Sequence, residues 1–194
     1  MEKLGVEKIY IVTGFNAEKI EQHVKDKNIQ CIYNPFWNCC NVLGSLYMAL
    51  PYLNDDFLFL HADTLVGIEA WEKLYSFEGD IVMPYKRKVC GEEEMKVFLD
   101  KDGNLLEVNK TMEGAKADGE FLGIAKFSES IISYLKNTAG KLFKTGKLDF
   151  YMEAAVEQAI QDKKNVKAFD IGETKFIEVD FEEDYMLARQ TFVL

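Results

Sequence analysis

The sequence predicts a three-layer α/β/α protein with a mostly parallel central sheet and one small antiparallel hairpin. Three observations lead to this fold class. Short apolar strands alternate with amphipathic helical stretches over residues 8–85, which is the pattern of βα units joined by helical crossovers. The run Phe57–Leu60 is apolar without alternation, as in a strand buried on both faces of a parallel sheet. Residues 95–110 instead form two short strand patterns around Asp102-Gly103, which predicts a hairpin.

Length and composition are those of a single globular domain spanning residues 1–194. With 48% apolar residues the chain can bury a full core. The net charge of 23 − 33 = −10 argues against a nucleic-acid partner, because no basic surface is available to neutralise phosphates. No apolar run approaches the roughly eighteen residues of a membrane-spanning helix, and no signal-peptide pattern opens the chain. We therefore expect a cytoplasmic protein with no membrane partner.

The expected elements follow in order from apolar periodicity and turn residues. In the first part, strands are expected at 8–13, 29–33, 57–61 and 80–85, with helices opening at Asn16, capped by Asn41 and spanning 67–77. In the second part, the hairpin at 95–110 is followed by strands at 118–127, 166–171 and 176–180 and by helices at 128–136 and 148–162. Gly123, inside the strand at 118–127, permits a bulge or a close ligand approach.

Two of these strands end in an aspartate, and both aspartates are candidate metal ligands. Asp63 follows the run Phe57–Leu60, and Asp180 ends the run Phe176–Val179. Ligands of parallel sheets bind beyond the carboxyl ends of strands, so two strands of one sheet would deliver both carboxylates to one edge and hold Mg²⁺. The alternative for Asp63 alone is a helix cap. His61 is expected to be a packed strand residue rather than a ligand.

Several stretches together resemble the GT-A-like nucleotidyltransferases over essentially the whole chain. They are residues 11–15, 34–46, 60–63, 94–97, 108–110, 118–124 and 178–184. The segments Asn41–Leu46 and Glu94–Val97 look most like those of cytidylyltransferases that act on phosphocholine or 2-aminoethylphosphonate. The resemblance implies a nucleotide-diphospho-sugar transferase-like fold and a Mg²⁺-dependent transfer of CMP from CTP to a phosphorylated or phosphonate acceptor, with release of pyrophosphate.

The resemblance also implies a role for each matching residue. Asp63 and Asp180 would hold Mg²⁺, with Asp63 also beside the nucleotide. Lys110 would contact the phosphate or phosphonate of the acceptor. Together, Lys110 and Lys96 would offset the repulsion between the two reacting anions; the alternative for Lys96 is a solvated hairpin residue. The remaining matches concern recognition: Asn41 and Ser45 would lie beside the nucleotide, and Glu120 would bind an acceptor ammonium or else be a strand-edge residue in solvent.

One departure from the family pattern keeps other functions open. The family opens with a strand and a glycine-rich loop that grips the triphosphate, whereas Gly5, Gly14 and Gly44 stand apart in this sequence. We expect a chain truncated at its N-terminus relative to the family, without the family's first strand. The alternatives are a catalytically silent domain that binds a nucleotide or a partner subunit, a sugar-1-phosphate nucleotidylyltransferase, and a glycosyltransferase. The sequence leaves open the nucleotide, the acceptor and whether the protein is a homo-oligomer.

Overall fold

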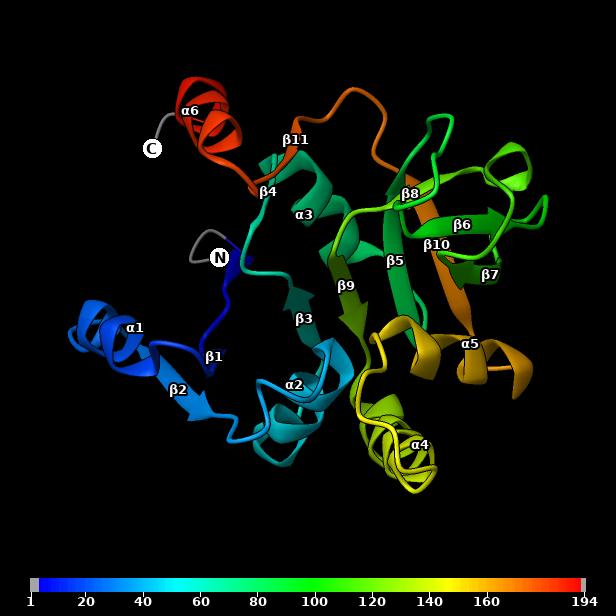
Figure 1. Cartoon of the computed structure of the whole chain (residues 1–194). Helices are drawn as coiled ribbons and strands as arrows, with labels where there is room; N and C mark the ends of the chain where they lie inside the picture. Colours follow the sequence, from blue (N-terminus) through cyan, green and yellow to red (C-terminus); the bar gives the residue numbers. More distant parts are fainter. Residues whose placement is uncertain (1–3, 193–194) are drawn as a thin grey trace. The chain divides into compact units, whose positions relative to one another are not determined.

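The computed structural model describes residues 4–192 (Figure 1). The described chain clusters into two compact units, each built from two stretches of sequence. The first unit contains residues 4–55 and 129–158, and the second contains residues 56–128 and 159–192. The single-domain organisation of residues 1–194 stays a prediction.

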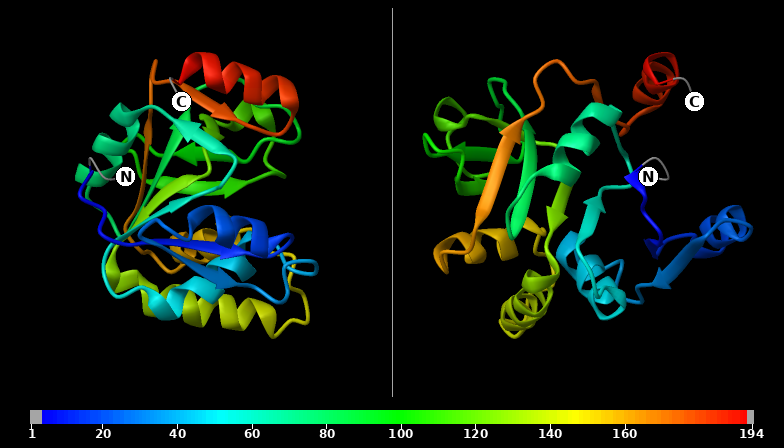
Figure 2. Two further views of the ribbon diagram at one scale, coloured as in Figure 1. Left: turned by 90° about the vertical axis from the view of Figure 1, so that its left-hand side faces the viewer. Right: turned by 180° about the vertical axis from the view of Figure 1, so that it is seen from behind.

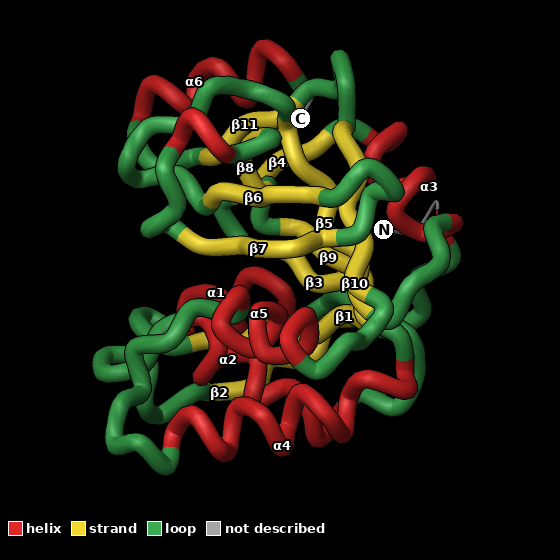
Figure 3. The backbone as a smooth tube through the Cα atoms, turned by 90° about the vertical axis from the view of Figure 1, so that its right-hand side faces the viewer, coloured by secondary structure: helices red, strands yellow, loops and turns green. Residues whose placement is uncertain are grey.

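The first unit opens with the expected β-α-β arrangement. Strand β1 (Ile9–Thr13) pairs in parallel with β2 (Ile29–Tyr33), and α1 (Ala17–Val24) connects them. The helix α2 (Val42–Ala49) begins as expected at Asn41, whose Oδ1 accepts a hydrogen bond from the Val42 N–H at 2.7 Å. It continues into the short helix η2 (Leu50–Tyr52) and lies against β1 and α4 (Figure 3). The remaining helices are η4 (Glu129–Ile131), α4 (Ile132–Phe143) and α5 (Glu153–Gln161), the last of which ends in the second unit.

The second unit is built on a seven-stranded sheet (Figure 3). Its order is β3 (Phe57–Leu60), β9 (Ile124–Phe127), β5 (Ile81–Lys86), β8 (Gly119–Phe121), β6 (Lys96–Leu99) and β7 (Leu105–Asn109), with β10 (Val166–Asp170) also paired to β5. Among these pairs only β5 and β10 run parallel. The expected α/β class is confirmed, but the prediction of a mostly parallel sheet is wrong.

The prediction of a mostly parallel sheet fails because apolar patterns do not determine the relative direction of neighbouring strands. An apolar run indicates burial but carries no information on the direction of its neighbour. Here β9 lies between β3 and β5 and runs antiparallel to both, which no pattern in residues 57–60 could reveal. The β3 residues are also only partly buried, and Leu60 is exposed, so the interpretation of a strand buried on both faces is wrong as well.

The expected strand at 118–127 is divided into β8 and β9 by an irregularity at residues 122–123, and both parts run antiparallel to β5. Gly123 lies at this break with φ +69°, in the left-handed region that glycine adopts without steric cost. A Cβ at this position would lie 2.7 Å from His61 Nδ1 and 3.0 Å from Thr64 Oγ1. The expected irregularity at Gly123 is therefore present, and it allows a close approach of the chain to His61.

The last strand of the chain does not join the seven-stranded sheet. Strand β11 (Phe176–Glu178) pairs antiparallel with β4 (Thr64–Val66), a short strand that the sequence analysis did not predict. We call this pair the β4–β11 ribbon. Figure 2 shows β11 leading directly into α6 (Glu182–Thr191), a helix with three acidic residues in its first turn. The expectation of two aspartate-bearing strands in one sheet is thus wrong.

Two further helices complete the second unit. Helix α3 (Ile68–Ser76) lies against β5 and β9 with Trp71 and Leu74 buried, and η3 (Gly114–Lys116) follows β7. The innermost strand residues, among them Ile81, Met83 and Phe127, have no exposed surface. Within residues 4–192, no helix combines the length and the apolar character needed to cross a bilayer.

Candidate metal and substrate site

The β4–β11 ribbon brings Asp63 and Asp180 together. Thr64 lies opposite Glu178 in the ribbon, and the Val179 N–H donates to the Asp63 carbonyl oxygen at 2.8 Å. Asp63 immediately precedes β4, and Asp180 lies two residues after β11. The Asp184 carboxylate accepts hydrogen bonds from the backbone N–H groups of Asp180 and Phe181, at 3.2 and 2.9 Å. The backbones of the two aspartates are therefore close together, although by a different pairing from the one expected.

A third carboxylate, that of Glu178, belongs to the same neighbourhood. Partial burial raises the pKa of Glu178, and the negative charges of Asp63, Asp180 and Glu120 raise it further, while Lys110 lowers it. These five groups thus share one electrostatic environment. Reasoning from strand ends overlooks Glu178, but a signal exists in the sequence: Glu178 and Asp180 are two residues apart, and such residues share one face of an extended chain.

His61 adds a nitrogen to this group of oxygen ligands. A ring nitrogen of His61 and one carboxylate oxygen each of Asp63 and Glu178 lie within 4.8 Å of one another. The Nε2 atom is buried and makes no hydrogen bond. Burial lowers the pKa of His61, although the nearby Asp63 opposes this shift, so the ring is neutral at pH 7. A set of carboxylate oxygens beside an unsatisfied neutral imidazole fits a divalent cation.

Lys96 is a buried residue of the hairpin. Lys96 is only 1% exposed. Its Nζ donates to the carbonyl oxygens of Glu92, Glu94 and Lys110 at 3.0, 3.2 and 2.7 Å. All three donors of the ammonium group are therefore used. The alternative of a solvated hairpin residue is wrong. In this arrangement Lys96 fixes the loop before β6 to the residue after β7.

Lys110 and Glu120 lie on either side of this buried lysine. Lys110 is partly exposed, with its Nζ 4.0 Å from the Glu93 carboxylate. Glu120 is not a strand-edge residue in solvent: its side chain is 16% exposed and accepts a hydrogen bond from Lys88 Nζ at 3.1 Å. Burial lowers the pKa of Lys88, but its hydrogen bonds to Glu94 and Glu120 outweigh this effect, and the pKa is raised. Glu120 therefore already holds an ammonium group.

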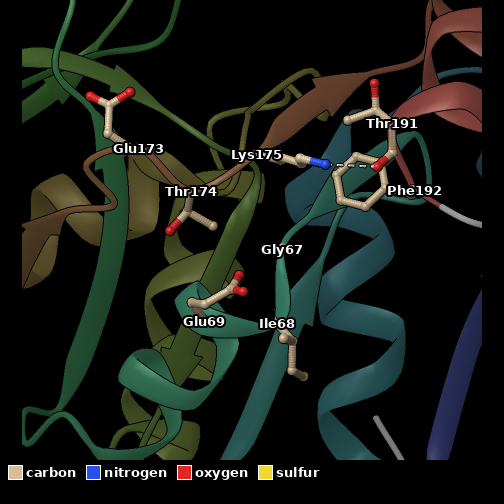
Figure 4. Close-up of a pocket in the computed structure, with 8 residues that line it drawn as sticks. All are labelled: Gly67, Ile68, Glu69, Glu173, Thr174, Lys175, Thr191 and Phe192. Atoms are coloured by element: carbon tan, nitrogen blue, oxygen red, sulfur yellow. Dashed lines mark hydrogen bonds between the residues drawn. The ribbon is translucent and has the colours of Figure 1, made fainter.

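A cavity of about 530 Å³ lies beside these lysines. Its walls include Cys90, Lys96, Lys110 and Thr111. A second cavity of about 500 Å³ lies between the start of α3 and the end of α6 (Figure 4). There Lys175 Nζ donates to the Thr191 carbonyl oxygen at 3.1 Å, and none of the site residues expected from sequence lines this second cavity. The first cavity is connected to the carboxylate site through Lys110, which lines it and lowers the pKa of Glu178.

The two residues expected beside the nucleotide belong to the first unit. Asn41 uses its Oδ1 to cap α2, and Ser45 Oγ accepts a hydrogen bond from the buried Asn34 at 3.3 Å. Asn34 also accepts from the Phe36 N–H at 2.9 Å. Asn34 thus joins the turn after β2 to the start of α2. The nucleotide-binding roles of Asn41 and Ser45 stay predictions.

Comparison with known proteins identifies the fold. No model of a known protein family matches the chain, and no curated protein sequence matches it. The inositol-1-phosphate CTP transferase from T. maritima is similar at a TM-score of 0.76 and 18% identity, over 94% of this chain and 74% of that one. The CTP:phosphocholine cytidylyltransferase LicC from Streptococcus pneumoniae is similar at 0.74 and 17%, over 98% and 80%.

A third similar structure was solved with a nucleotide analogue. HddC from Yersinia pseudotuberculosis complexed with GMP-PN matches at a TM-score of 0.70 and 18% identity, over 98% of this chain and 81% of that one. At these identities the similarity concerns the fold. The chain has the fold of the nucleotidyltransferases.

Proposed function

We propose that this chain is a Mg²⁺-dependent nucleotidyltransferase, which joins CMP from CTP to a phosphorylated or phosphonate acceptor such as phosphocholine or 2-aminoethylphosphonate and releases pyrophosphate. The observation that carries the proposal is the meeting of Asp63, Glu178 and Asp180 at the β4–β11 ribbon. The similarity of the fold to two CTP-using transferases supports the choice of reaction. Binding of a nucleotide analogue by HddC supports a nucleotide as the partner.

The chemistry of this reaction explains why the carboxylates are needed. The acceptor oxygen and the triphosphate are both anionic, so their approach must be compensated by positive charge. Asp63 and Asp180, with Glu178, would hold the Mg²⁺ ion, which supplies that charge and polarises a phosphoryl oxygen when bound. Lys110 lies within the electrostatic reach of Glu178 and lines the 530 Å³ cavity, so it would bind the phosphate or phosphonate of the acceptor.

The other polar residues would recognise the substrates. Asn41 and Ser45 would contact the nucleotide. Glu120 would bind the acceptor ammonium, and the Lys88 ammonium at 3.1 Å shows that this carboxylate accommodates such a group. An amino-alcohol or aminophosphonate would then compete with Lys88 for Glu120. Lys96, whose donors are all used, would hold the backbone of Lys110 in place.

A second candidate function is binding without catalysis. It is favoured because two polar groups that were expected to face the substrates already have partners within the protein. Lys96 donates to three carbonyl oxygens, and Glu120 is paired with Lys88. A silent domain would bind a nucleotide or a phosphorylated metabolite and release no pyrophosphate.

The deciding experiment follows pyrophosphate in the presence of Mg²⁺. The chain is incubated with each of CTP, UTP, ATP and GTP, together with phosphocholine or 2-aminoethylphosphonate. We expect pyrophosphate release with CTP. In Asp63→Asn and Asp180→Asn the rate of release should fall by at least about 100-fold, because charge compensation at a reacting phosphate commonly contributes an effect of that size. Asp102→Asn, in the exposed hairpin turn, is the matched control and should keep full activity. Absence of release with every nucleotide would reject transfer and favour the silent domain.

A further inference from the structure

His61 belongs to the candidate metal site. One of its ring nitrogens lies within 4.8 Å of carboxylate oxygens of both Asp63 and Glu178. Ligands of one divalent ion at bond lengths of about 2.1 Å are separated by up to about 4 Å, so the three groups are close to the spacing of ligands on a common ion. Neither ring nitrogen of His61 makes a hydrogen bond within residues 4–192. Of the two, Nε2 is buried; a buried polar atom without a partner is costly, and an ion bound there would satisfy it.

The surroundings of the ring restrict its orientation. The Phe59 ring meets the imidazole edge to face at 5.2 Å, and the Phe121 ring lies at 6.4 Å in a similar arrangement. Gly123 lies against Nδ1 so closely that an added Cβ would be 2.7 Å away. The backbone of His61 is fixed by a hydrogen bond from its N–H to the Gly123 carbonyl oxygen at 2.9 Å. The imidazole is thus held beside the carboxylates and has little freedom to turn away.

We propose that His61 is a ligand of the metal site formed with Asp63 and Glu178, and that its nitrogen makes this site prefer divalent transition ions such as Mn²⁺ to Mg²⁺. The reason is ligand chemistry: Mg²⁺ prefers oxygen ligands in octahedral geometry, whereas imidazole nitrogen binds first-row transition ions more strongly. This inference deepens the proposed function, since it concerns the metal of the same site. It concerns binding, and its test does not depend on turnover.

The experiment uses the fact that the chain contains two histidines, His61 and His23. His23 lies on the exposed side of α1 in the first unit. The full chain is labelled with ¹⁵N-histidine, loaded with Mn²⁺, and examined by pulsed electron paramagnetic resonance. We expect coupling of the manganese to one imidazole ¹⁵N. The coupling should persist in His23→Gln, the matched control, and disappear in His61→Gln.

Affinities provide the second measurement. Mn²⁺ and Mg²⁺ dissociation constants are determined for the three proteins by calorimetric titration. In His61→Gln the Mn²⁺ affinity should fall at least about tenfold, which is the lower end of what loss of a supporting residue at a metal site costs, while the Mg²⁺ affinity should change less than about twofold. The preference for Mn²⁺ over Mg²⁺ should therefore shrink.

The outcomes separate this inference from the proposed function. Manganese bound without nitrogen coupling in the wild-type chain would overturn the inference even if pyrophosphate is released. Absence of Mn²⁺ binding would overturn it too. Nitrogen coupling that depends on His61, in a protein that releases no pyrophosphate with any nucleotide, would support the inference while rejecting the transferase. Since the coupling is measured on the wild-type chain, the test stands even if His61→Gln fails to fold.

Discussion

Glu178 links the candidate site to the stability of the protein at the scale of one residue. Its pKa is raised in the folded state by partial burial and by neighbouring negative charges, so folding favours the protonated form. The stabilisation from this group is fully present below the ordinary glutamate pKa of about 4.3 and is lost as the pH rises through the raised folded value. Ionisation of Glu178 therefore destabilises the metal-free protein.

The substitution Glu178→Gln tests this conclusion, because glutamine resembles the protonated acid. At pH 7.5 with a chelator we expect the variant to melt higher than the wild type, by no more than about 2 °C, since solvent screens charges at a partly exposed site. The difference should vanish near pH 4. Calorimetric melting at both pH values measures it. Glu173→Gln, an exposed loop residue, is the control; an equal rise there, or a lower melting temperature in Glu178→Gln, would contradict the argument.

The residues of the site were predictable from sequence to different degrees. Asp63 and Asp180 could be predicted because an apolar run ending in an acid is a strong local pattern. His61 and Glu178 lie inside or at the edge of strands, where a polar side chain that faces solvent and one that faces a ligand look alike in sequence. Only the pairing of Thr64 with Glu178 reveals that these side chains face the same place.

At the scale of the elements, the hairpin β6–β7 depends on one buried ammonium group. Lys96→Met keeps the length of the side chain but leaves the carbonyl oxygens of Glu92, Glu94 and Lys110 without their donor. Loss of buried hydrogen bonds to a charged group should lower the free energy of unfolding by about 3 kcal/mol. Urea denaturation measures the loss. Lys101→Met, in the exposed turn of the same hairpin, should cost less than about 0.5 kcal/mol, and equal effects would refute the role given to Lys96.

The break between β8 and β9 yields a prediction of its own. Gly123→Ala places a Cβ against His61 Nδ1 and Thr64 Oγ1 in a backbone conformation with φ +69°. Strain of this kind costs about 1–3 kcal/mol. We expect a matching loss of stability in urea denaturation, together with weaker Mn²⁺ binding because His61 is displaced. The matched control is Gly146→Ala, where φ is +85° but no atom lies within 4 Å of the added Cβ; it shares the backbone strain and should leave Mn²⁺ binding unchanged.

The elements themselves were largely predictable, whereas their pairing was not. Periodicity placed β1, β2 and β10 within one residue of their observed bounds, because local pattern and local structure agree there. Strand β4 has three residues, which is too short to show any period. Strand β9 runs antiparallel to both β3 and β5, and its apolar residues carry no information on that direction. Strand partners are set by the whole chain, so the sequence patterns did not reveal them.

At the scale of the whole molecule, binding of a metal ion should stabilise the second unit. An ion present at 100 times its dissociation constant adds about 2.7 kcal/mol to the free energy of unfolding, which corresponds to at least about 5 °C in melting temperature for a chain of this size. The chain has two tryptophans, Trp37 in the first unit and Trp71 buried in the second. In a Trp37→Phe background, fluorescence therefore reports on the second unit.

We expect Mg²⁺ or Mn²⁺ to raise the Trp71-reported melting temperature and a chelator to reverse the rise. The double substitution Asp63→Asn and Asp180→Asn should abolish the shift, while Asp102→Asn should preserve it. A shift that survives the double substitution would place the ion elsewhere. If neither ion changes the melting temperature of the wild-type protein, the result would argue against any metal site at the β4–β11 ribbon.

The long sequence separation between the two strands of the β4–β11 ribbon has a consequence for biosynthesis. Asp63 emerges from the ribosome early, but its partners Glu178 and Asp180 emerge more than one hundred residues later. A nascent polypeptide can assemble the seven-stranded sheet, whose last strand ends at Asp170, before it can capture an ion. A chain that ends between Asp170 and Phe176 would contain every strand of the seven-stranded sheet but only one side of the metal site, so metal binding would require residues 176–180 as well.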